Sequence, residues 1–182
     1  AVLPGSRTHE VHRNWPIMLD AIAELSETHP GHRFAVAAYR SRHRQWCESE
    51  ALRRHPRLPV DFYEGATSEI IDYCSCAMMV SGSVSLEMMA RRTPATVLYR
   101  VGRFLYGFGK CVVKVDSVTL PNLMPDPDES RASQSIQRVF PEIISVGKSS
   151  VAKAFLVENV GRMMSDPEYL KQKREQLARQ SS

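Results

Sequence analysis

Short apolar segments alternate with amphipathic ones along most of the chain, and this alternation restricts the fold more than any other feature. The predicted strands are 2–3, 34–38, 60–63, 77–80 and 95–99. Continuous apolar strands that alternate with helices are typical of a parallel sheet with helices on both faces. Because crossovers between parallel strands are right-handed, we predict an α/β fold with a Rossmann-like, doubly wound parallel sheet.

The segments between the predicted strands have the spacing of amphipathic helices. In the first of them, the apolar residues that share one face are Trp15, Met18, Leu19, Ile22 and Leu25. Further helices are predicted at 40–55, 67–73, 84–92 and 103–113. From Ser149 an apolar stripe runs to Met164, Asp166-Pro167 breaks it, and a charged terminal helix continues toward Arg179. We therefore expect C-terminal helices after the strand-rich part of the chain.

The composition is that of a globular domain and excludes several classes of protein. The 182 residues are 43% hydrophobic and 24% charged, with a formal net charge of +4. No apolar run approaches the ~18 residues of a membrane span, and no signal peptide is recognisable. The mild positive charge suits an anionic ligand or surface, and we expect no nucleic acid partner. Four scattered cysteines favour a reducing cytoplasm.

The chain begins with Ala1-Val2-Leu3, which resembles the end of a strand more than the start of a protein. We therefore expect an excised domain that lacks part of its first strand and everything before it. The Rossmann-like unit is predicted to cover 1–148. The C-terminal helices, 149–182, follow it. We expect the first of them to stay on its own domain and the terminal one to be mobile or held by another chain.

Two of the predicted strands end in small and polar residues. Pro4-Gly5-Ser6-Arg7 follows the first strand, and Ser81-Gly82-Ser83 follows the strand 77–80. In open parallel sheets, ligands bind outside the carboxyl ends of the strands. Glycine backbone, a helix N-terminus and a forked cation such as Arg7 favour phosphate. Glu87, about one turn into the next helix, can accept hydrogen bonds from sugar hydroxyls, so the set suggests a diphosphate with a ribose attached.

The same residues also fit a purely structural interpretation. Ser-Gly-Ser before a helix is a common N-cap, an acid such as Glu87 is favourable in a first turn, and Arg7 alone is compatible with a surface charge. Metal binding is not expected, because 9–12 is one residue too short for a zinc-protease motif and Cys74-Ser75-Cys76 has no second pair. The basic run at 40–57 fits a solvated helix face or contact with anionic lipid.

Four motifs, in order, resemble those of the lipid-A-disaccharide synthase family. They are Val-Leu-Pro-Gly-Ser-Arg-x-x-Glu-Val at 2–11, Ser-Gly-Ser-x-Ser-Leu-Glu at 81–87, Pro94 to Arg100, and Val-Thr-Leu-Pro-Asn-Leu at 118–123. Together they cover most of residues 2–124. Two departures occur after them: the family's Pro-Glu-Leu-x-Gln is Pro-Glu-Ile-Ile-Ser at 141–145, and an extra stretch lies between Leu123 and Val139.

The resemblance implies one half of a GT-B fold, namely the C-terminal domain that binds a UDP-sugar beside a cleft. It also implies that the C-terminal helices, 149–182, can pack on the N-terminal domain or on a partner chain. It implies a hexosyltransferase that transfers 2,3-diacylglucosamine from UDP to 2,3-diacylglucosamine 1-phosphate, forming the lipid A disaccharide of lipopolysaccharide biosynthesis. The implied catalytic residues are Arg7 and Asn122. The implied UDP-binding residues are Gly5, Ser6, Arg7, Ser81, Gly82, Ser83 and Glu87. No bound metal is implied, and we expect no cofactor.

The implied partners are the UDP-2,3-diacylglucosamine donor, the acylated glucosamine 1-phosphate acceptor and an inner-membrane surface. The protein would be cytoplasmic and peripheral to the inner membrane of a Gram-negative-type bacterium, with a homodimer as one arrangement. The family's general-base candidates lie in the other domain, so we expect the isolated chain to be inactive. The alternatives are another GT-B enzyme that uses UDP-N-acetylglucosamine and a flavodoxin-like module without catalysis, against which Pro4–Arg7 argues.

Overall fold

A computed structural model describes residues 1–100, 139–145 and 149–181. The described part contains a six-stranded sheet in the order β3-β2-β1-β4-β5-β6, with parallel pairings between neighbours. The strands are β1 (Val2–Leu3), β2 (Phe34–Ala38), β3 (Val60–Glu64), β4 (Ala77–Val80), β5 (Ala95–Arg100) and β6 (Glu142–Ser145). This order is that of a doubly wound, Rossmann-like sheet, so the predicted fold class is confirmed.

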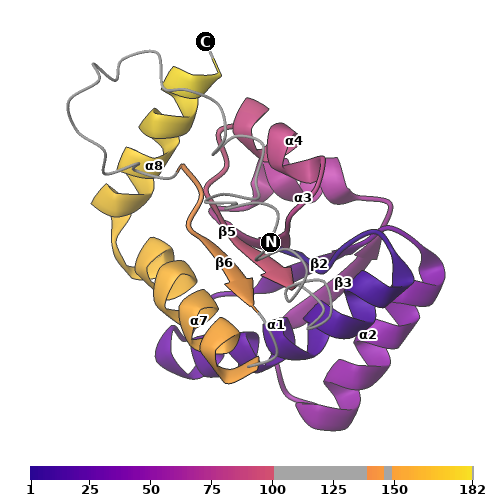
Figure 1. Ribbon diagram of the computed structural model, residues 1–182. Coiled ribbons are helices and arrows are strands. Elements are labelled where there is room, and N and C mark those ends of the chain that lie inside the picture. The colour runs from indigo at the N-terminus through magenta and orange to yellow at the C-terminus, as the bar shows by residue number, and fades with distance from the viewer. Residues whose placement is uncertain (101–138, 146–148, 182) are drawn as a thin grey trace, which may run out of the picture.

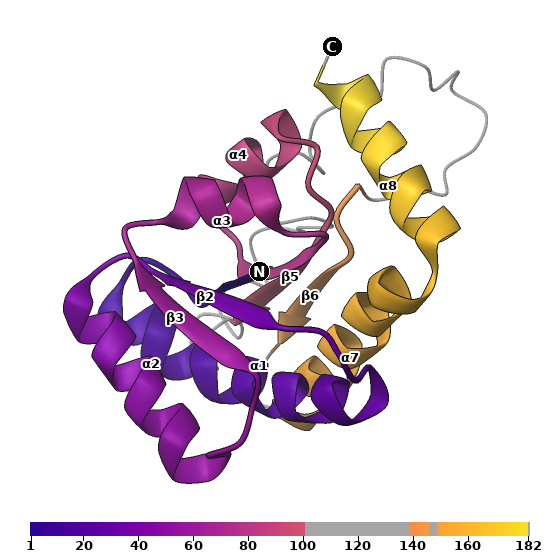
Figure 2. The same ribbon diagram turned by 180° about the vertical axis from the view of Figure 1, so that it is seen from behind.

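Helices cover both faces of the sheet. They are α1 (Thr8–Thr28), α2 (Ser41–Arg54), α3 (Thr67–Tyr73), α4 (Val84–Ala90), α7 (Ser149–Ser165) and α8 (Pro167–Gln180). Helices α1, α2 and α7 lie on one face, while α3 and α4 lie on the other (Figures 1 and 2). The predicted helices at 40–55, 67–73 and 84–92 therefore exist, with ends within two residues of the expected ones. The predicted helix at 103–113 lies outside the described residues.

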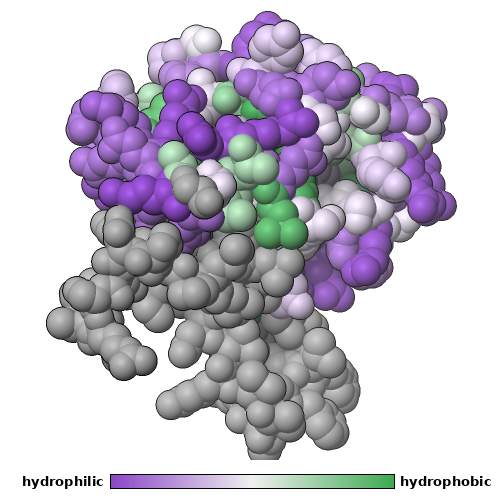
Figure 3. Space-filling model, turned by 90° about the horizontal axis from the view of Figure 1, so that it is seen from above, coloured by the Kyte–Doolittle hydropathy of each residue, from purple (hydrophilic) through white to green (hydrophobic). Residues whose placement is uncertain are grey.

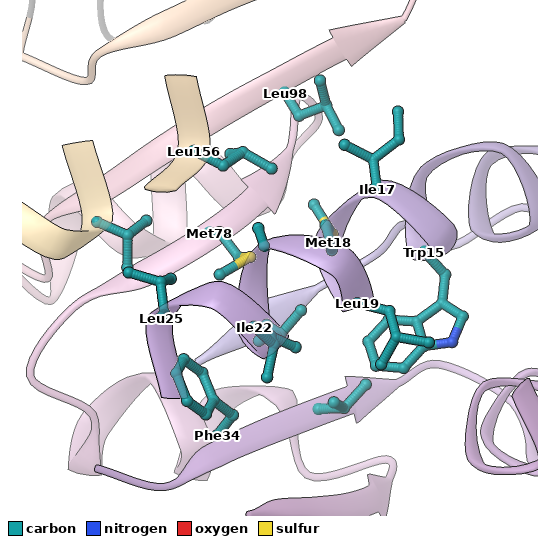
Figure 4. Close-up of a cluster of buried hydrophobic side chains, with 14 of the residues drawn as sticks. Trp15, Ile17, Met18, Leu19, Ile22, Leu25, Phe34, Met78, Leu98 and Leu156 are labelled. Atoms are coloured by element: carbon teal, nitrogen blue, oxygen red, sulfur yellow. The ribbon is translucent and has the colours of Figure 1, made fainter. Parts of the chain in front are cut away.

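The apolar stripe of α1 forms the centre of the larger core. Trp15, Met18, Leu19, Ile22 and Leu25 are each fully buried, as their spacing predicts. In Figure 4 they face side chains of the sheet and of α7, the labelled ones being Phe34, Met78, Leu98 and Leu156. Each such burial contributes about 1.5–3 kcal/mol to the free energy of unfolding. This packing holds the N-terminal end of α1 at a fixed place beside the sheet.

Strand β6 was not predicted from the sequence. Its residues, Glu142-Ile143-Ile144-Ser145, contain only two apolar positions, and half of the strand is polar. The segment is a strand because it pairs with β5: Leu98 lies opposite Ile143, and Arg100 lies opposite Ser145. Pairing with the buried strand β5 thus makes this segment a strand, although its own residues predict a strand only weakly.

The two C-terminal helices both pack on the sheet of their own chain. Helix α7 buries Ala152, Leu156, Val160 and Met163 against the face that holds α1, in agreement with the predicted stripe. Helix α8, expected to be mobile or held by another chain, instead contacts α4. Leu177 is fully buried there, and Arg174 donates to the carbonyl of Ser75 over 3.3 Å. The apolar edge of α8 therefore finds a surface on its own sheet.

Candidate functional site

The loop after β1 is shaped by Gly5. Its φ of +118° lies in a region that side-chain-bearing residues rarely adopt. A Cβ atom at this position would also lie 2.9 Å from Cβ of Glu10 and 3.1 Å from its Oε2. Both the backbone conformation and the close approach therefore require glycine. The result is a tight loop that leads directly from β1 into α1.

Glu10 closes this loop. Its Oε2 accepts hydrogen bonds from the backbone N–H groups of Ser6 (3.3 Å) and Arg7 (3.1 Å), and its Oε1 accepts one from the Arg7 guanidinium (3.1 Å). The Arg7 side chain is 74% exposed. A protein carboxylate thus accepts the hydrogen bonds of backbone N–H groups at the helix N-terminus, a place where an anion is electrostatically favoured. Arg7, predicted to contact phosphate, is paired with a protein carboxylate in the structure.

The loop after β4 has a similar composition and a different arrangement. Ser83 occupies the N-cap of α4 without making a side-chain cap hydrogen bond. The hydroxyl of Ser85, which is fully buried, donates to the carbonyl of Gly82 over 2.7 Å. A Cβ at Gly82 would meet nothing within 4 Å. Ser83 thus takes the N-cap position that the structural interpretation gave it, but its side chain does not make the hydrogen bond of an N-cap.

A cavity of about 460 Å³ lies between these two loops. Its lining consists of Leu3, Gly5, Ser6, Glu10, Ala37, Tyr39, Thr67, Val80, Ser81, Gly82, Ser83, Val84 and Glu87. Strands β1 and β4 are neighbours at the point where the strand order reverses, which is where doubly wound sheets bind ligands. The predicted residues therefore converge on one cavity, with the exception of Arg7, which does not line it, and Asn122, which lies outside the described residues.

Glu87 is anchored to the helix beside it. Ser68 of α3 donates to its Oε1 over 2.6 Å, and Nε of Arg91 lies 3.2 Å from the same oxygen. Arg91 also pairs with Asp72, and that hydrogen bond raises the pKa of the arginine. The carboxylate is thus held at the cavity wall between α3 and α4 through one of its two oxygens.

Sequence reasoning missed three residues that bring a polar or aromatic side chain to the cavity. Glu10 carries a signal that could have found it, because an acid three residues after a helix cap often bonds back to the cap amide. Tyr39 follows β2 directly and is 62% exposed, so an aromatic residue just beyond a strand end was the available sign. Thr67, at the start of α3, has no comparable signal in the sequence.

A buried histidine lies beneath the N-terminal end of α1. His43 is only 1% exposed, and its Nε2 lies 3.1 Å from the hydroxyl oxygen of Thr8. Burial lowers the pKa of His43, and the nearby charges of Arg42 and Arg40 and the neighbouring His12 lower it further. The ring therefore stays neutral at pH 7 and fixes the first residue of the helix beside the loop.

A second, larger cavity of about 720 Å³ lies at the opposite edge of the sheet, around the first residues of β2 and β4. None of the predicted site residues that the structure describes lines it. Within the described ranges, no group of three or more His, Cys, Asp or Glu side chains is arranged to hold a metal ion. By size alone the second cavity would be the candidate site. The chemistry of the lining residues favours the smaller cavity, which lies beyond Leu3 and Val80.

The described surface seen from above is mostly hydrophilic, with a small group of hydrophobic side chains near its middle (Figure 3). Among the described helices, none combines the length and the apolar character needed to cross a bilayer.

The sequence matches one protein family over nearly its whole length. The family's sequence model, described as Lipid-A-disaccharide synthetase, matches residues 1–180. The lipid-A-disaccharide synthase of Psychromonas ingrahamii is 31% identical over 128 residues, which are 70% of this chain and 34% of that protein. That of Alcanivorax borkumensis is 29% identical over 168 residues, or 92% of this chain and 40% of that protein.

The lipid-A-disaccharide synthase of Pseudomonas aeruginosa is 33% identical over 124 residues, which are 68% of this chain and 32% of that protein. The chain thus spans about a third to two fifths of the length of the curated relatives it matches. A solved structure described as "Crystal structure of GtfA/B complex" aligns with 99% of this chain and 33% of that chain, at 12% identity and a TM-score of 0.47.

Proposed function

The chain belongs to the lipid-A-disaccharide synthetase family, and from this premise we propose that it is the donor-binding part of a GT-B hexosyltransferase. The whole enzyme transfers 2,3-diacylglucosamine from UDP to 2,3-diacylglucosamine 1-phosphate. The products are UDP and the lipid A disaccharide precursor. In this proposal, residues 1–148 bind the donor, and 149–182 are the C-terminal helices of the same unit.

The observation that carries the proposal is the cavity at the carboxyl ends of β1 and β4. It collects Gly5, Ser6, the loop 81–83 and Glu87 from two loops and one helix. The UDP diphosphate lies against the two loops. Because Glu87 is anchored through Oε1, its other oxygen accepts hydrogen bonds from the ribose hydroxyls. A cavity of about 460 Å³ is within the usual range of ligand sites.

Catalysis in this proposal rests on stabilising the departing UDP. Negative charge grows on the diphosphate as the sugar–oxygen bond breaks, and fixed N–H groups and cations facing it lower the barrier. Arg7 is the cation that the first loop supplies, and in this proposal it reaches the phosphate by releasing Glu10 and binding the ligand instead. The isolated chain is inactive, because orienting donor and acceptor across two domains contributes much of the rate.

Asn122 is the second catalytic residue in the proposal. In the full-length enzyme, Asn122→Ala lowers turnover sharply and leaves the melting temperature nearly unchanged. A large fall in melting temperature with normal turnover would assign the side chain to a turn.

The proposal also places the enzyme on the cytoplasmic side of an inner membrane, as a peripheral protein, with a homodimer as one assembly. The mild positive charge of the chain is compatible with an anionic lipid surface. Several basic side chains of α2 are engaged within the protein, since Arg44 pairs with Glu48, Arg53 with Glu50, and Arg54 with Asp20. Cosedimentation with anionic and with neutral vesicles measures this part of the proposal separately.

Calorimetric titration of the chain with UDP, UDP-N-acetylglucosamine and flavin mononucleotide tests the donor site. We expect the two uridine nucleotides to bind and the flavin nucleotide not to bind. Preferential binding of flavin mononucleotide would support the flavodoxin-like alternative and reject the proposal.

Glu87→Ala sharpens the test. It weakens UDP binding by about 10-fold or more, since a hydrogen bond to a charged group contributes roughly 1.5–3 kcal/mol, and it leaves pyrophosphate binding unchanged. Glu158→Ala, which removes an exposed acid on α7, is the matched control. Equal weakening of UDP and pyrophosphate would remove Glu87 from the ribose.

A further inference from the structure

One aromatic side chain in the cavity has no evident structural duty. Tyr39 follows β2 directly, lines the cavity, and is 62% exposed. No hydrogen bond of its hydroxyl occurs within the described part of the chain, and its one ring contact there is with Arg40, whose guanidinium carbon lies 5.8 Å from the ring centroid. An exposed aromatic ring that lines a cavity suits a ligand site, because such sites are lined mostly by hydrophobic and aromatic side chains.

Two other tyrosines serve as a comparison. Tyr63 and Tyr73 are also exposed, at 45% and 91%, and both line the larger cavity at the opposite edge of the sheet. Tyr39 is therefore the exposed tyrosine that the described structure places in the candidate site. Tyr39 differs from Tyr63 and Tyr73 because its exposed ring lies at the cavity that also contains the two glycine–serine loops.

The order of the strands places Tyr39 at one end of the cavity. From β4 to β1 to β2, the cavity is bordered by Ser81–Ser83, then Gly5-Ser6, then Tyr39. Neighbouring strands are about 4.8 Å apart, so the β4 loop and Tyr39 are separated by roughly 10 Å. Glu87 and Thr67 line the wall beside this path. The cavity thus brings together two phosphate-favouring loops, a carboxylate suited to ribose and an aromatic ring, which are the three kinds of group that the parts of a nucleotide need.

We propose that Tyr39 forms the base subsite, where its ring stacks on the uracil of the donor nucleotide. This inference rests on the proposed function, since it assumes a nucleoside diphosphate in this cavity. Stacking between a base and an aromatic side chain uses the faces of both rings and does not depend on the base's edge. Tyr39 therefore contributes affinity for the nucleoside, and discrimination between bases comes from other groups.

The test compares the wild-type chain with two variants of Tyr39. The wild-type chain, Tyr39→Phe and Tyr39→Leu are each titrated calorimetrically with UDP and with pyrophosphate. Tyr39→Leu loses the ring and weakens UDP about 10- to 100-fold, the range expected for one stacked base. Tyr39→Phe keeps the ring and stays within about threefold of wild type. Pyrophosphate, which has no base, binds all three equally. CDP should lose affinity in Tyr39→Leu by the same factor as UDP.

Tyr73→Leu is the matched control, because it removes an exposed tyrosine outside the site and should leave UDP binding unchanged. Tyr39→Trp supplies a second measurement: UDP should quench the added fluorescence relative to the wild-type background, and pyrophosphate should not. Melting temperatures confirm that each variant is folded.

The outcomes separate this inference from the proposed function. If the folded wild-type chain does not bind UDP, the proposed function fails and the base subsite fails with it. If the wild type binds UDP and Tyr39→Leu binds it equally well, only the base subsite is rejected. Equal weakening of UDP and pyrophosphate by Tyr39→Leu also rejects it, because a stacking residue does not act on a ligand without a base.

Discussion

The loops after β1 and β4 lie at the same edge of the sheet and have similar residues, yet the nearby carboxylate of each makes different contacts. In the first, the carboxylate of Glu10 bonds to the loop's own amides and to Arg7. In the second, the carboxylate of Glu87 bonds to Ser68 and Arg91 on the α3 side. The first loop is closed by a protein anion, whereas the second directs its anion away from its own backbone.

A shift of one helical position explains the difference. Glu10 is the third residue of α1, from which a carboxylate can reach back to the cap amide. Glu87 is the fourth residue of α4, and the additional residue turns its side chain about 100° further around the helix axis, toward α3. Where an acid sits in the first turn thus decides whether a glycine–serine loop is already neutralised or still available to phosphate.

Alanine at the two glycines should separate the loops most strongly. Gly5→Ala places a side chain at a φ of +118° and against Glu10, so it should lower the free energy of unfolding by about 1–3 kcal/mol or more. Gly82→Ala should change it by less than about 0.5 kcal/mol, because its Cβ would meet open space. Thermal unfolding of both variants measures this, and equal shifts in melting temperature would contradict the contrast.

Acidification should lower the free energy of unfolding, because His43 is buried in its neutral form beside Thr8. Its pKa in the folded state is lowered, so between that value and the unfolded value near 6.5 the unfolded chain binds the additional proton. Stability is therefore complete above pH 6.5 and falls as the pH decreases, by at most about 1.4 kcal/mol per pH unit from this group. Melting temperatures at pH 7.5 and 5.5 should diverge more in wild type than in His43→Gln. An identical pH dependence in both would exclude His43 as the cause.

Neutralising the two acids should have different effects on a base-free anion. Glu10→Gln should strengthen pyrophosphate binding about fivefold, because a like charge at about 4 Å costs roughly 1 kcal/mol even in water. Glu87→Gln should leave it unchanged, since that carboxylate faces Ser68 and Arg91. Calorimetric titration compares the two variants. Weaker pyrophosphate binding in Glu10→Gln would mean that Glu10 supports the anion site through Arg7 instead of competing with the anion.

The smallest expected effect is that of Ser68→Ala. Loss of its hydroxyl removes one of two anchors of Glu87 and leaves Arg91 in place. UDP affinity should fall about threefold, at the lower end of a net hydrogen bond of about 0.5–1.5 kcal/mol. Ser49→Ala, on the surface of α2, is a suitable control. A loss as large as that of Glu87→Ala would show that Ser68 alone positions the carboxylate.

The sequence predicts the sheet where burial leaves a continuous apolar run, as at Phe34–Ala38 and Ala77–Val80. It does not predict β6, because Glu142 and Ser145 interrupt the pattern and only the pairing with β5 makes the segment a strand. It also misplaces α8, since the mostly charged helix gives little sign that Leu177 finds a buried place near α4. The local pattern is therefore sufficient for the central strands and for the edge strand β3, and insufficient for β6 and for the place of α8.

The same limit applies to the site. Glycines and serines at strand ends identify both loops, because parallel topology alone brings those ends to one edge. The partners of the charged side chains do not follow from composition: Ser68 reaches Glu87 only when α3 and α4 lie together. Arg7 was predicted to contact a phosphate from its chemistry, whereas its pairing with Glu10 depends on the cap geometry of α1.

The central position of β1 has a consequence for how the protein folds. Its neighbours are β2 and β4, and Ala1 bonds to the carbonyl of Cys76, 75 residues further along the chain. Pairings between such distant segments form slowly, because a long loop must be closed before any contact is gained. At a synthesis rate of roughly 5–20 residues per second, β1 waits about 4–15 s for β4 to be made. The two loops of the site meet only when β1 pairs with β4, so the ability to bind a ligand arises when the two halves of the sheet join.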